Sequence, residues 1–124
     1  MNQTVANPLC YLEIPAPDLA RAEAFYLKIF SWESRRSGDA YSMFQAGTLE
    51  GGFDSKKKPS PEGGIVFYIK VADIPATLTA ISNAGGTIIK QRTDIGEGWG
   101  FFGLFLDPNG NRIGLWERDK ASSG

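Results

Sequence analysis

Histidine is absent from this chain of 124 residues. Its absence removes the usual general base at neutral pH and the commonest protein ligand of transition metals. Only one cysteine, Cys10, is present, so neither an internal disulfide nor a cysteine–histidine zinc site can form within one chain. Mechanisms of the Ser-His-Asp and Cys-His kinds are excluded on the same ground. Because Cys10 lies in an apolar run, we expect a buried, unreactive thiol.

A strong excess of charge and a long apolar segment are also lacking. The net charge of −1 gives no bias toward nucleic acid or an anionic membrane. No apolar run approaches the ~20 residues of a membrane-spanning helix, and residues 1–8 are too polar for a secretion signal. With a single cysteine as well, we expect a cytoplasmic protein without nucleic-acid or membrane partners.

The chain is long enough for one globular domain, and its pattern of strands and helices occurs twice. In the first half, Asp18 is a good N-cap for a helix over residues 19–30, which carries a single apolar stripe. Period-2 alternation and turn residues predict strands around this helix at 9–14, 32–36, 40–45 and 48–54.

The second half repeats this order. Asp73 is the N-cap of a helix that Gly85-Gly86 ends, with Pro75 in its first turn. Strands are predicted at 65–71, 87–92, 101–106 and 112–117, and residues 95–100 form a glycine-rich loop. The two N-caps lie 55 positions apart, and the same offset pairs Ile14 with Ile69.

A strand–helix–three-strand unit cannot bury both its sheet face and its helix alone, so two copies should pack as one domain. We therefore predict an α+β domain of two βαβββ repeats, at about 8–54 and 65–118, joined by a linker at 55–64. Residues 1–7 would form an N-terminal arm, and residues 119–124 a C-terminal tail.

The last predicted strand has two different faces. It follows the turn formers Asp107-Pro108-Asn109-Gly110, which we interpret as structural. Ile113 and Leu115 need a core, whereas Arg112 and Trp116 flank Gly114 on the other face. That open face could form a cleft wall, but this stretch alone favours the exposed face of an ordinary hairpin, because most strand faces carry no chemistry.

Several short motifs, each weak alone, occur together in order. They are Glu13-Ile14-Pro15-Ala16-Pro17-Asp18, Ala22-Glu23-Ala24-Phe25-Tyr26, Val71-Ala72-Asp73, Ala84-Gly85-Gly86 and Asp107-Pro108-Asn109-Gly110-Asn111 before Ile113-Gly114-Leu115-Trp116. With the double repeat, residues 8–118 resemble the vicinal oxygen chelate superfamily, which includes glyoxalase I, fosfomycin-resistance enzymes, extradiol dioxygenases and bleomycin-resistance proteins. The resemblance implies a curved mixed sheet around an open cleft.

The resemblance also implies where metal ligands stand in the family's enzymes. Carried over by position, these fall at Tyr11, Val66, Gly114 and one of residues 50–52. A phenol, an isopropyl group and a hydrogen cannot replace imidazole and carboxylate ligands, and at best Glu50 would remain. We therefore expect no metal and no other cofactor.

Strand alternation then gives the residues that should face the cleft. These ligand-binding candidates are Tyr11, Glu13, Tyr68, Lys70, Arg112 and Trp116, with Trp99 of the glycine-rich loop able to close over them. Aromatic walls with a few charges are typical of a small-molecule pocket. We interpret the chain as a metal-independent binder of a small aromatic or amphipathic molecule, similar to the bleomycin-resistance branch.

Two other functions stay open. One is a metal-independent lyase or isomerase that uses Glu13 or Tyr11 as its acid or base, with Arg112 or Lys70 stabilising an oxyanion. The other is a partner-binding or regulatory module whose cleft is filled by its own side chains. Glu13 could instead form a structural ion pair with Arg112 or Lys70. The resemblance also implies a homodimer.

Overall fold

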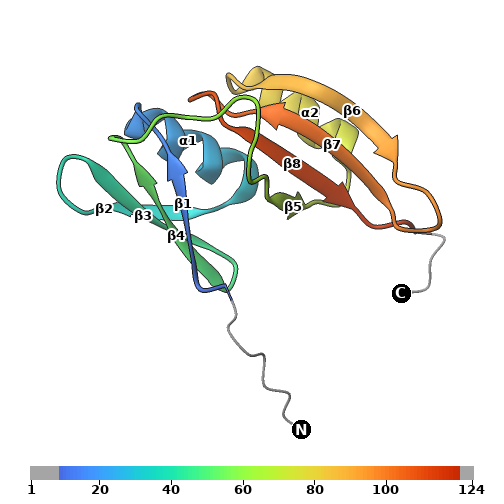
Figure 1. The fold of residues 1–124 in the computed structure, drawn as a ribbon, viewed down its shortest axis with the longest axis horizontal. Coiled ribbons are helices and arrows are strands. Elements are labelled where there is room, and N and C mark those ends of the chain that lie inside the picture. Colours follow the sequence, from blue (N-terminus) through green and yellow to red (C-terminus); the bar gives the residue numbers. More distant parts are fainter. Residues whose placement is uncertain (1–8, 121–124) are drawn as a thin grey trace, which may run out of the picture.

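A computed structural model describes residues 9–120, and these form two four-stranded sheets, each with one helix (Figure 1). The predicted arm at 1–7 and residues 121–124 of the predicted tail lie outside the described residues. The elements are β1 Tyr11–Pro15, α1 Leu19–Phe30, β2 Glu33–Arg36, β3 Tyr41–Ala46, β4 Leu49–Asp54, β5 Tyr68–Lys70, α2 Ile74–Asn83, β6 Thr87–Asp94, β7 Phe101–Leu106 and β8 Arg112–Glu117.

The two sheets have the same topology. Their strand orders are β1-β4-β3-β2 and β5-β8-β7-β6, with the first strand of each half parallel to the last and the other pairs antiparallel. The predicted α+β fold of two βαβββ repeats is confirmed. The two halves lie side by side, joined by the segment from β4 to β5 (Figure 1).

Both predicted helix starts are confirmed. The Asp18 carboxylate accepts a hydrogen bond from the Arg21 amide, and the Asp73 carboxylate accepts one from the Ala76 amide, each at 3.0 Å. These bonds satisfy amides that lack a partner in the first turn of a helix. No helix within residues 9–120 is long and apolar enough to cross a membrane.

The fifth strand is shorter than predicted. Residues 65–71 were expected to form it, but β5 is only Tyr68–Lys70. Gly63 and Gly64 adopt φ values of +108° and +95°, which turn the chain just before the strand. Arg112 then holds this turn, since its Nε donates to the Pro61 carbonyl at 2.8 Å.

The core of the first half is aromatic. Tyr26 stacks on Trp32 with ring centroids 5.0 Å apart, and Trp32 stacks on Phe44 at 4.9 Å. The ring centroid of Phe105, from the second half, lies 6.1 Å from that of Phe25. Burial of such rings is the main stabilising contribution in a domain of this size, and here it also joins the two halves.

A buried polar junction holds the two halves together. Tyr26, which is fully buried, donates its hydroxyl proton to the Asp107 carboxylate at 2.8 Å. The Asn111 side-chain amide donates to the Pro15 carbonyl at 2.6 Å, and the Asn109 side chain accepts from the Asp18 amide at 2.8 Å. The turn at 107–111, interpreted from the sequence as a turn alone, is therefore also the contact between the repeats.

Cys10 corrects a prediction, because its thiol is exposed. The paired segment of β1 begins only at Tyr11, opposite Glu50. Cys10 therefore lies before the sheet and is not covered by it. An apolar run in the sequence indicated burial, but the run extends beyond the strand that the core covers.

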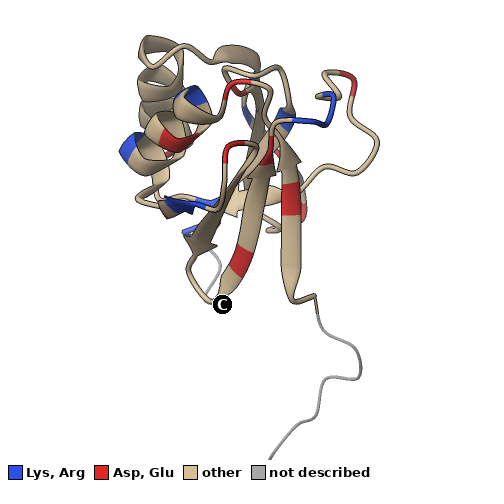
Figure 2. Cartoon of the chain, turned by 90° about the vertical axis from the view of Figure 1, so that its left-hand side faces the viewer, with Lys and Arg blue, Asp and Glu red and all other residues tan. Residues whose placement is uncertain are grey.

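Charged side chains do not gather on one face. In Figure 2, Lys and Arg lie interspersed with Asp and Glu over α1, the strands and the loops. This agrees with the net charge of −1. The nearly buried carboxylate of Glu117 on β8 is paired with the half-exposed Arg92 of β6 at 3.0 Å, and it also accepts a hydrogen bond from the Ile74 amide at the start of α2 at 2.8 Å.

Acid should weaken the fold partly through Glu117. Burial acts to raise the pKa of this carboxyl, but the hydrogen bonds from Arg92 and the Ile74 amide outweigh it and hold the pKa below its ordinary value. Stability from a lowered pKa is present above the unfolded-state value of about 4.3 and is lost as pH falls through the folded-state value. We expect Glu117→Gln to flatten the loss of stability between pH 6 and pH 3, measured by urea unfolding. Exposed Glu62→Gln is the control, and an unchanged acid slope in E117Q would contradict this role.

Candidate functional site

The strand register of the first sheet separates a core face from an open face. Tyr11 is paired with Glu50 across β1 and β4, and Glu13 is paired with Gly52. Gly51 points the other way, because a Cβ built on it would meet the Phe44 ring of the core. Of the three candidate positions at 50–52, Glu50 and Gly52 therefore share the open face with Tyr11, and Gly51 does not.

In each half, a tyrosine ring covers a glycine of the last strand, namely Gly52 in the first half and Gly114 in the second. The 55-residue offset makes Glu13 equivalent to Tyr68, and their parallel partners are Gly52 and Gly114. A Cβ at Gly52 would overlap the phenol of Tyr41, and a Cβ at Gly114 would overlap the ring of Tyr68. The aromatic rings thus occupy the space beside the last strand of each half, where the resemblance places ligand side chains.

The residues at these positions do not fit a metal centre. Within residues 9–120, no group of three or more His, Cys, Asp or Glu side chains is arranged to hold a metal ion. Val66 offers only an aliphatic group, and the Tyr11 hydroxyl is hydrogen-bonded to Tyr41 at 2.8 Å. Hard divalent cations require several oxygen ligands, which these side chains do not supply.

A chain of hydrogen bonds runs along the open face of the first sheet. Lys57 donates to one oxygen of Glu13 at 2.7 Å, and Tyr41 donates to the other at 3.1 Å. Because Tyr41 has a single proton and gives it to Glu13, Tyr11 must donate in the 2.8 Å bond between the two phenols. The exposed oxygen of Tyr11 is therefore left as an acceptor.

This chain disfavours Glu13 as a general base. The hydrogen bond from Lys57, followed by that from Tyr41, holds the pKa of Glu13 below its ordinary value. Burial and the bonds to Tyr11 and Glu13 raise the pKa of Tyr41, so its phenol stays protonated. A base that works near neutral pH needs a raised carboxyl pKa, which is the opposite shift.

Glu13 forms an ion pair, but not with either of the partners predicted for it. Its cation is Lys57, which the sequence indicated as part of a solvated basic loop, and not Arg112 or Lys70. Arg112 is engaged by the Pro61 carbonyl, although it and Glu13 both line a small hollow of about 200 Å³ between the halves. Lys70 lies over the Trp116 ring, with its Nζ 5.8 Å from the ring centroid.

The second sheet carries an apolar hollow of about 510 Å³, here called the aromatic hollow. Four side chains line it: Tyr68, Ile95, Phe102 and Trp116. The Trp116 indole donates to the Trp99 carbonyl at 3.0 Å, which holds the glycine-rich loop beside the hollow. Trp99 itself is 67% exposed. The structure therefore brings together Tyr68 and Trp116, with Lys70 and Trp99 beside them.

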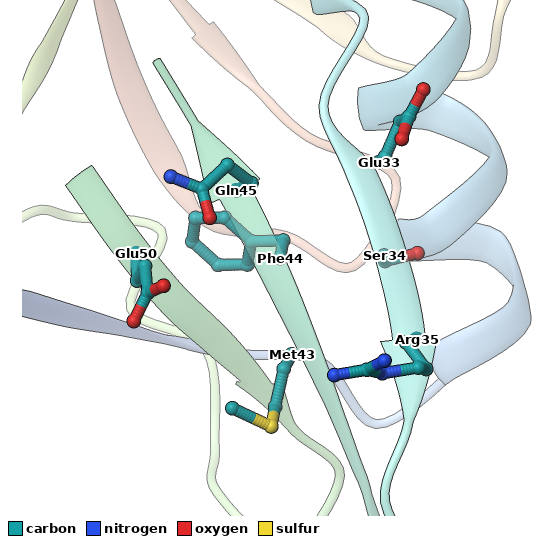
Figure 3. A pocket seen from close by; sticks show the side chains of 7 residues that line it. All are labelled: Glu33, Ser34, Arg35, Met43, Phe44, Gln45 and Glu50. Carbon is teal, nitrogen blue, oxygen red and sulfur yellow. The ribbon is translucent and has the colours of Figure 1, made fainter. Parts of the chain in front are cut away.

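The first sheet carries a separate, more polar hollow of about 330 Å³, here called the β2–β4 hollow (Figure 3). Its lining residues are Glu33, Ser34, Arg35, Met43, Phe44, Gln45 and Glu50. Apart from Glu50, none of these residues was predicted from the sequence. Alternation in 32–36 and 40–45 places Glu33 and Arg35 on one face of their strand and Met43 and Gln45 on one face of theirs, but only the register of β2, β3 and β4 brings them together with Glu50.

The seven predicted ligand-binding residues do not form one wall within the chain. Tyr11 and Glu13 lie on the first sheet, whereas Tyr68, Lys70 and Trp116 lie on the second. No strand of the first sheet is hydrogen-bonded to a strand of the second in the described part of the chain, although Glu13 and Arg112 line the hollow between the halves. The residues facing out of each sheet were predicted from alternation, but the relative placement of the sheets was not.

Comparison with known proteins agrees with this architecture. The family model of the Glyoxalase/Bleomycin resistance protein/Dioxygenase superfamily matches residues 9–115. A glyoxylase-like domain-containing protein from Didymella fabae is 33% identical over an alignment of 116 residues, which covers 86% of this chain and 91% of that protein.

Two crystal structures show the same fold at low identity. A glyoxalase/bleomycin resistance protein/dioxygenase family enzyme from Burkholderia phytofirmans has a TM-score of 0.75 at 18% identity, over 90% of this chain and 99% of that one. The fosfomycin resistance protein FosX from Listeria monocytogenes, complexed with Mn(II) and sulfate, has a TM-score of 0.78 at 16% identity, over 92% of each chain. The chain belongs to the Glyoxalase/Bleomycin resistance protein/Dioxygenase superfamily.

Proposed function

We propose that this chain binds a small aromatic or amphipathic molecule at the aromatic hollow of its second sheet, without a metal ion. The observation that carries the proposal is the hollow itself. Its volume is about 510 Å³, and its lining is apolar and consists of Tyr68, Ile95, Phe102 and Trp116. Pockets of this size with aromatic walls are typical of small-molecule sites. Lys70, 5.8 Å from the Trp116 ring, adds one cation at the rim.

The absence of metal ligands supports binding without a metal. FosX of Listeria monocytogenes is complexed with Mn(II), but here Gly52 and Gly114 lie beneath tyrosine rings. Metal-free binding is favoured over metal-free catalysis by Glu13, because Lys57 and Tyr41 lower the pKa of that carboxyl. Purified protein that retained a stoichiometric divalent metal through dialysis would contradict the proposal.

Ligand binding should be detectable as thermal stabilisation. A ligand at about ten times its Kd adds about 1.4 kcal/mol to the free energy of unfolding, which raises Tm by about 5 °C in a domain of this length. We expect aromatic hits from a thermal-shift screen to lose most of this shift in Phe102→Ala and Trp116→Ala. Leu27→Ala, at an exposed leucine of α1, is the control and should keep the shift.

The same experiment separates the alternatives. Recovery of the unchanged hit after incubation supports a binding protein, whereas a new product would establish an enzyme. A library in which no aromatic compound shifts Tm would favour a partner-binding module and contradict the proposal. Hits that shift Tm equally in the wild type and both hollow variants would place the site elsewhere.

We also propose that the protein acts as a homodimer, in which the open face of one sheet is completed by a second copy. Tyr68 is 52% exposed and Trp99 67% exposed in the single chain, which is unusual for large apolar side chains. Light scattering after gel filtration should give twice the mass of one chain. A monomer at all concentrations would contradict this part of the proposal.

A further inference from the structure

The β2–β4 hollow carries two opposite charges on either side of a thioether. Arg35 lies on β2, Met43 on β3 and Glu50 on β4. In Figure 3, the Arg35 guanidinium extends toward the Met43 side chain, and the Glu50 carboxylate lies on the other side of Met43. Met43 is 40% exposed, so its thioether forms an accessible apolar floor between the two charges.

Within residues 9–120, neither of these two charges has a partner. Arg36 is paired with Glu23, Lys57 with Glu13 and Arg92 with Glu117, so none of these ion pairs includes Arg35 or Glu50. No hydrogen bond or ion pair is formed by the side chain of Arg35 or Glu50 in this part of the chain. The neighbouring Arg36 points to the other face and is held at 3.0 Å by Glu23 of α1, so Arg35 alone of this pair is available to the hollow.

The spacing of the charges is set by the sheet. Strands β2 and β4 both pair with β3, so their backbones lie about 10 Å apart, which is twice the spacing of neighbouring strands. Arg35 is opposite Met43, and Glu50 is opposite Gln45 on the same face. The two charged ends are therefore separated by roughly the length of a small molecule, and they lie more than the 4 Å of an ion pair apart.

Tyr11 lies next to the hollow on the same open face without lining it. It is the cross-strand neighbour of Glu50, and its own proton is committed to Tyr41. Its remaining lone pairs can only accept a hydrogen bond. Glu33 adds a second carboxylate to the lining, so the charged residues of the hollow sum to one negative charge.

We infer that the β2–β4 hollow binds an amphoteric small molecule, with its carboxylate on Arg35, its ammonium group on Glu50 and an apolar or aromatic middle over Met43. Planar guanidinium suits a carboxylate, and an ammonium group can donate to the Glu50 carboxylate. A thioether packs favourably against an aromatic ring. The inference concerns the first sheet and does not depend on ligand binding at the aromatic hollow.

Three matched probes test the inference. 4-(Aminomethyl)benzoate carries both charges at opposite ends of a ring, 4-methylbenzylamine lacks the carboxylate and 4-methylbenzoate lacks the ammonium group. The chain contains two methionines, so the methyl NMR signal of Met43 reports on the hollow directly. We expect the amphoteric probe to bind about three- to tenfold more tightly than either partner, as expected for partly exposed charged contacts.

Two charge-neutralising variants assign each end. Arg35→Gln should abolish the advantage over 4-methylbenzylamine alone, and Glu50→Gln should abolish the advantage over 4-methylbenzoate alone. Exposed Lys58→Gln and Glu62→Gln make the same charge changes outside the hollow and should leave both ratios unchanged. Trp116→Ala, on the second sheet, should also leave them unchanged, which separates this site from the proposed aromatic one.

The results that overturn the inference are equally specific. Equal affinity of the three probes, or ratios that survive both variants, would mean that Arg35 and Glu50 do not select the ligand. A Met43 methyl signal that does not move with the amphoteric probe would mean that the hollow does not bind it. Each of these results leaves the thermal-shift test of the aromatic hollow unaffected.

Discussion

Replacing Asp107 with alanine is expected to lower the free energy of unfolding by about 3 kcal/mol, as is typical when a buried hydrogen-bonded network is broken. The carboxylate is 3% exposed and accepts hydrogen bonds from Tyr26, from the backbone amides of Asn109 and Asn111, and from the Asn111 side chain. Alanine would leave these donors buried without an acceptor.

Tyr26→Phe is the matched comparison, because it removes a single hydroxyl from the same network. Asp107 would keep its bonds from Asn109 and Asn111, so we expect a loss of about 1 kcal/mol. Asp39→Ala, at an exposed turn, is the control and should change stability by less than about 0.5 kcal/mol. The measurement is urea unfolding, which gives the midpoint and the m-value, the dependence of the free energy of unfolding on urea concentration. A change in the m-value reports a change in cooperativity.

The location of Asp107 gives this measurement a second use. Because the network joins the turn before β8 to helix α1 and to Pro15, its loss should loosen the contact between the halves as well as destabilise the whole. A lower m-value of urea unfolding in Asp107→Ala than in Tyr26→Phe would indicate that the halves unfold separately. Equal, small losses in both variants would contradict a structural role for this junction.

Local sequence signals were sufficient for the elements of the fold. Asp18 and Asp73 mark both helix starts, and the alternation of Ile113 and Leu115 with Gly114 gives the correct core face of β8. These features depend on neighbours a few residues apart, which period and capping rules describe. The double βαβββ order then followed from their succession along the chain.

Long-range contacts were not predictable in the same way. Nothing in the sequence near Glu13 indicates that Lys57 would reach it, or that Tyr41 would lie between Glu13 and Tyr11. Alternation gives the face on which a residue lies, but it does not give the placement of one sheet against another. The residues predicted to face one cleft therefore lie on two sheets, with Glu13 and Arg112 meeting at the hollow between the halves, and the β2–β4 hollow was missed.

Gly51→Ala is expected to be the most disruptive small substitution in β4, with a loss of about 3 kcal/mol, because overpacking against a fixed backbone cannot relax. A Cβ at Gly51 would meet the Leu12 carbonyl oxygen of β1 and the Phe44 ring of the core. Relief would require the parallel pair of β1 and β4 to separate. The residue is buried, so no side of it is open to solvent.

Gly52→Ala, one residue further on, provides the control within the same strand. Neither glycine has a positive φ, so alanine fits both backbones and reduces the entropy of the unfolded chain equally. The Cβ at position 52 meets only the phenol end of Tyr41, which can rotate away at the cost of its bonds to Glu13 and Tyr11. We expect a loss of about 1 kcal/mol, near that of losing one or two exposed hydrogen bonds.

Urea unfolding of both variants tests the difference between a backbone and a side-chain obstacle. The Tyr41→Ala/Gly52→Ala double variant should be about as stable as Tyr41→Ala alone, since the obstacle is already gone, whereas Tyr41→Ala should not rescue Gly51→Ala. Equal losses at the two glycines would contradict this account. The same reasoning applies to Gly114 beneath Tyr68, so restoring a carboxylate there would first require that ring to move. Within the described residues, a tyrosine ring thus fills the space beside the last strand of each half, at Gly52 and at Gly114.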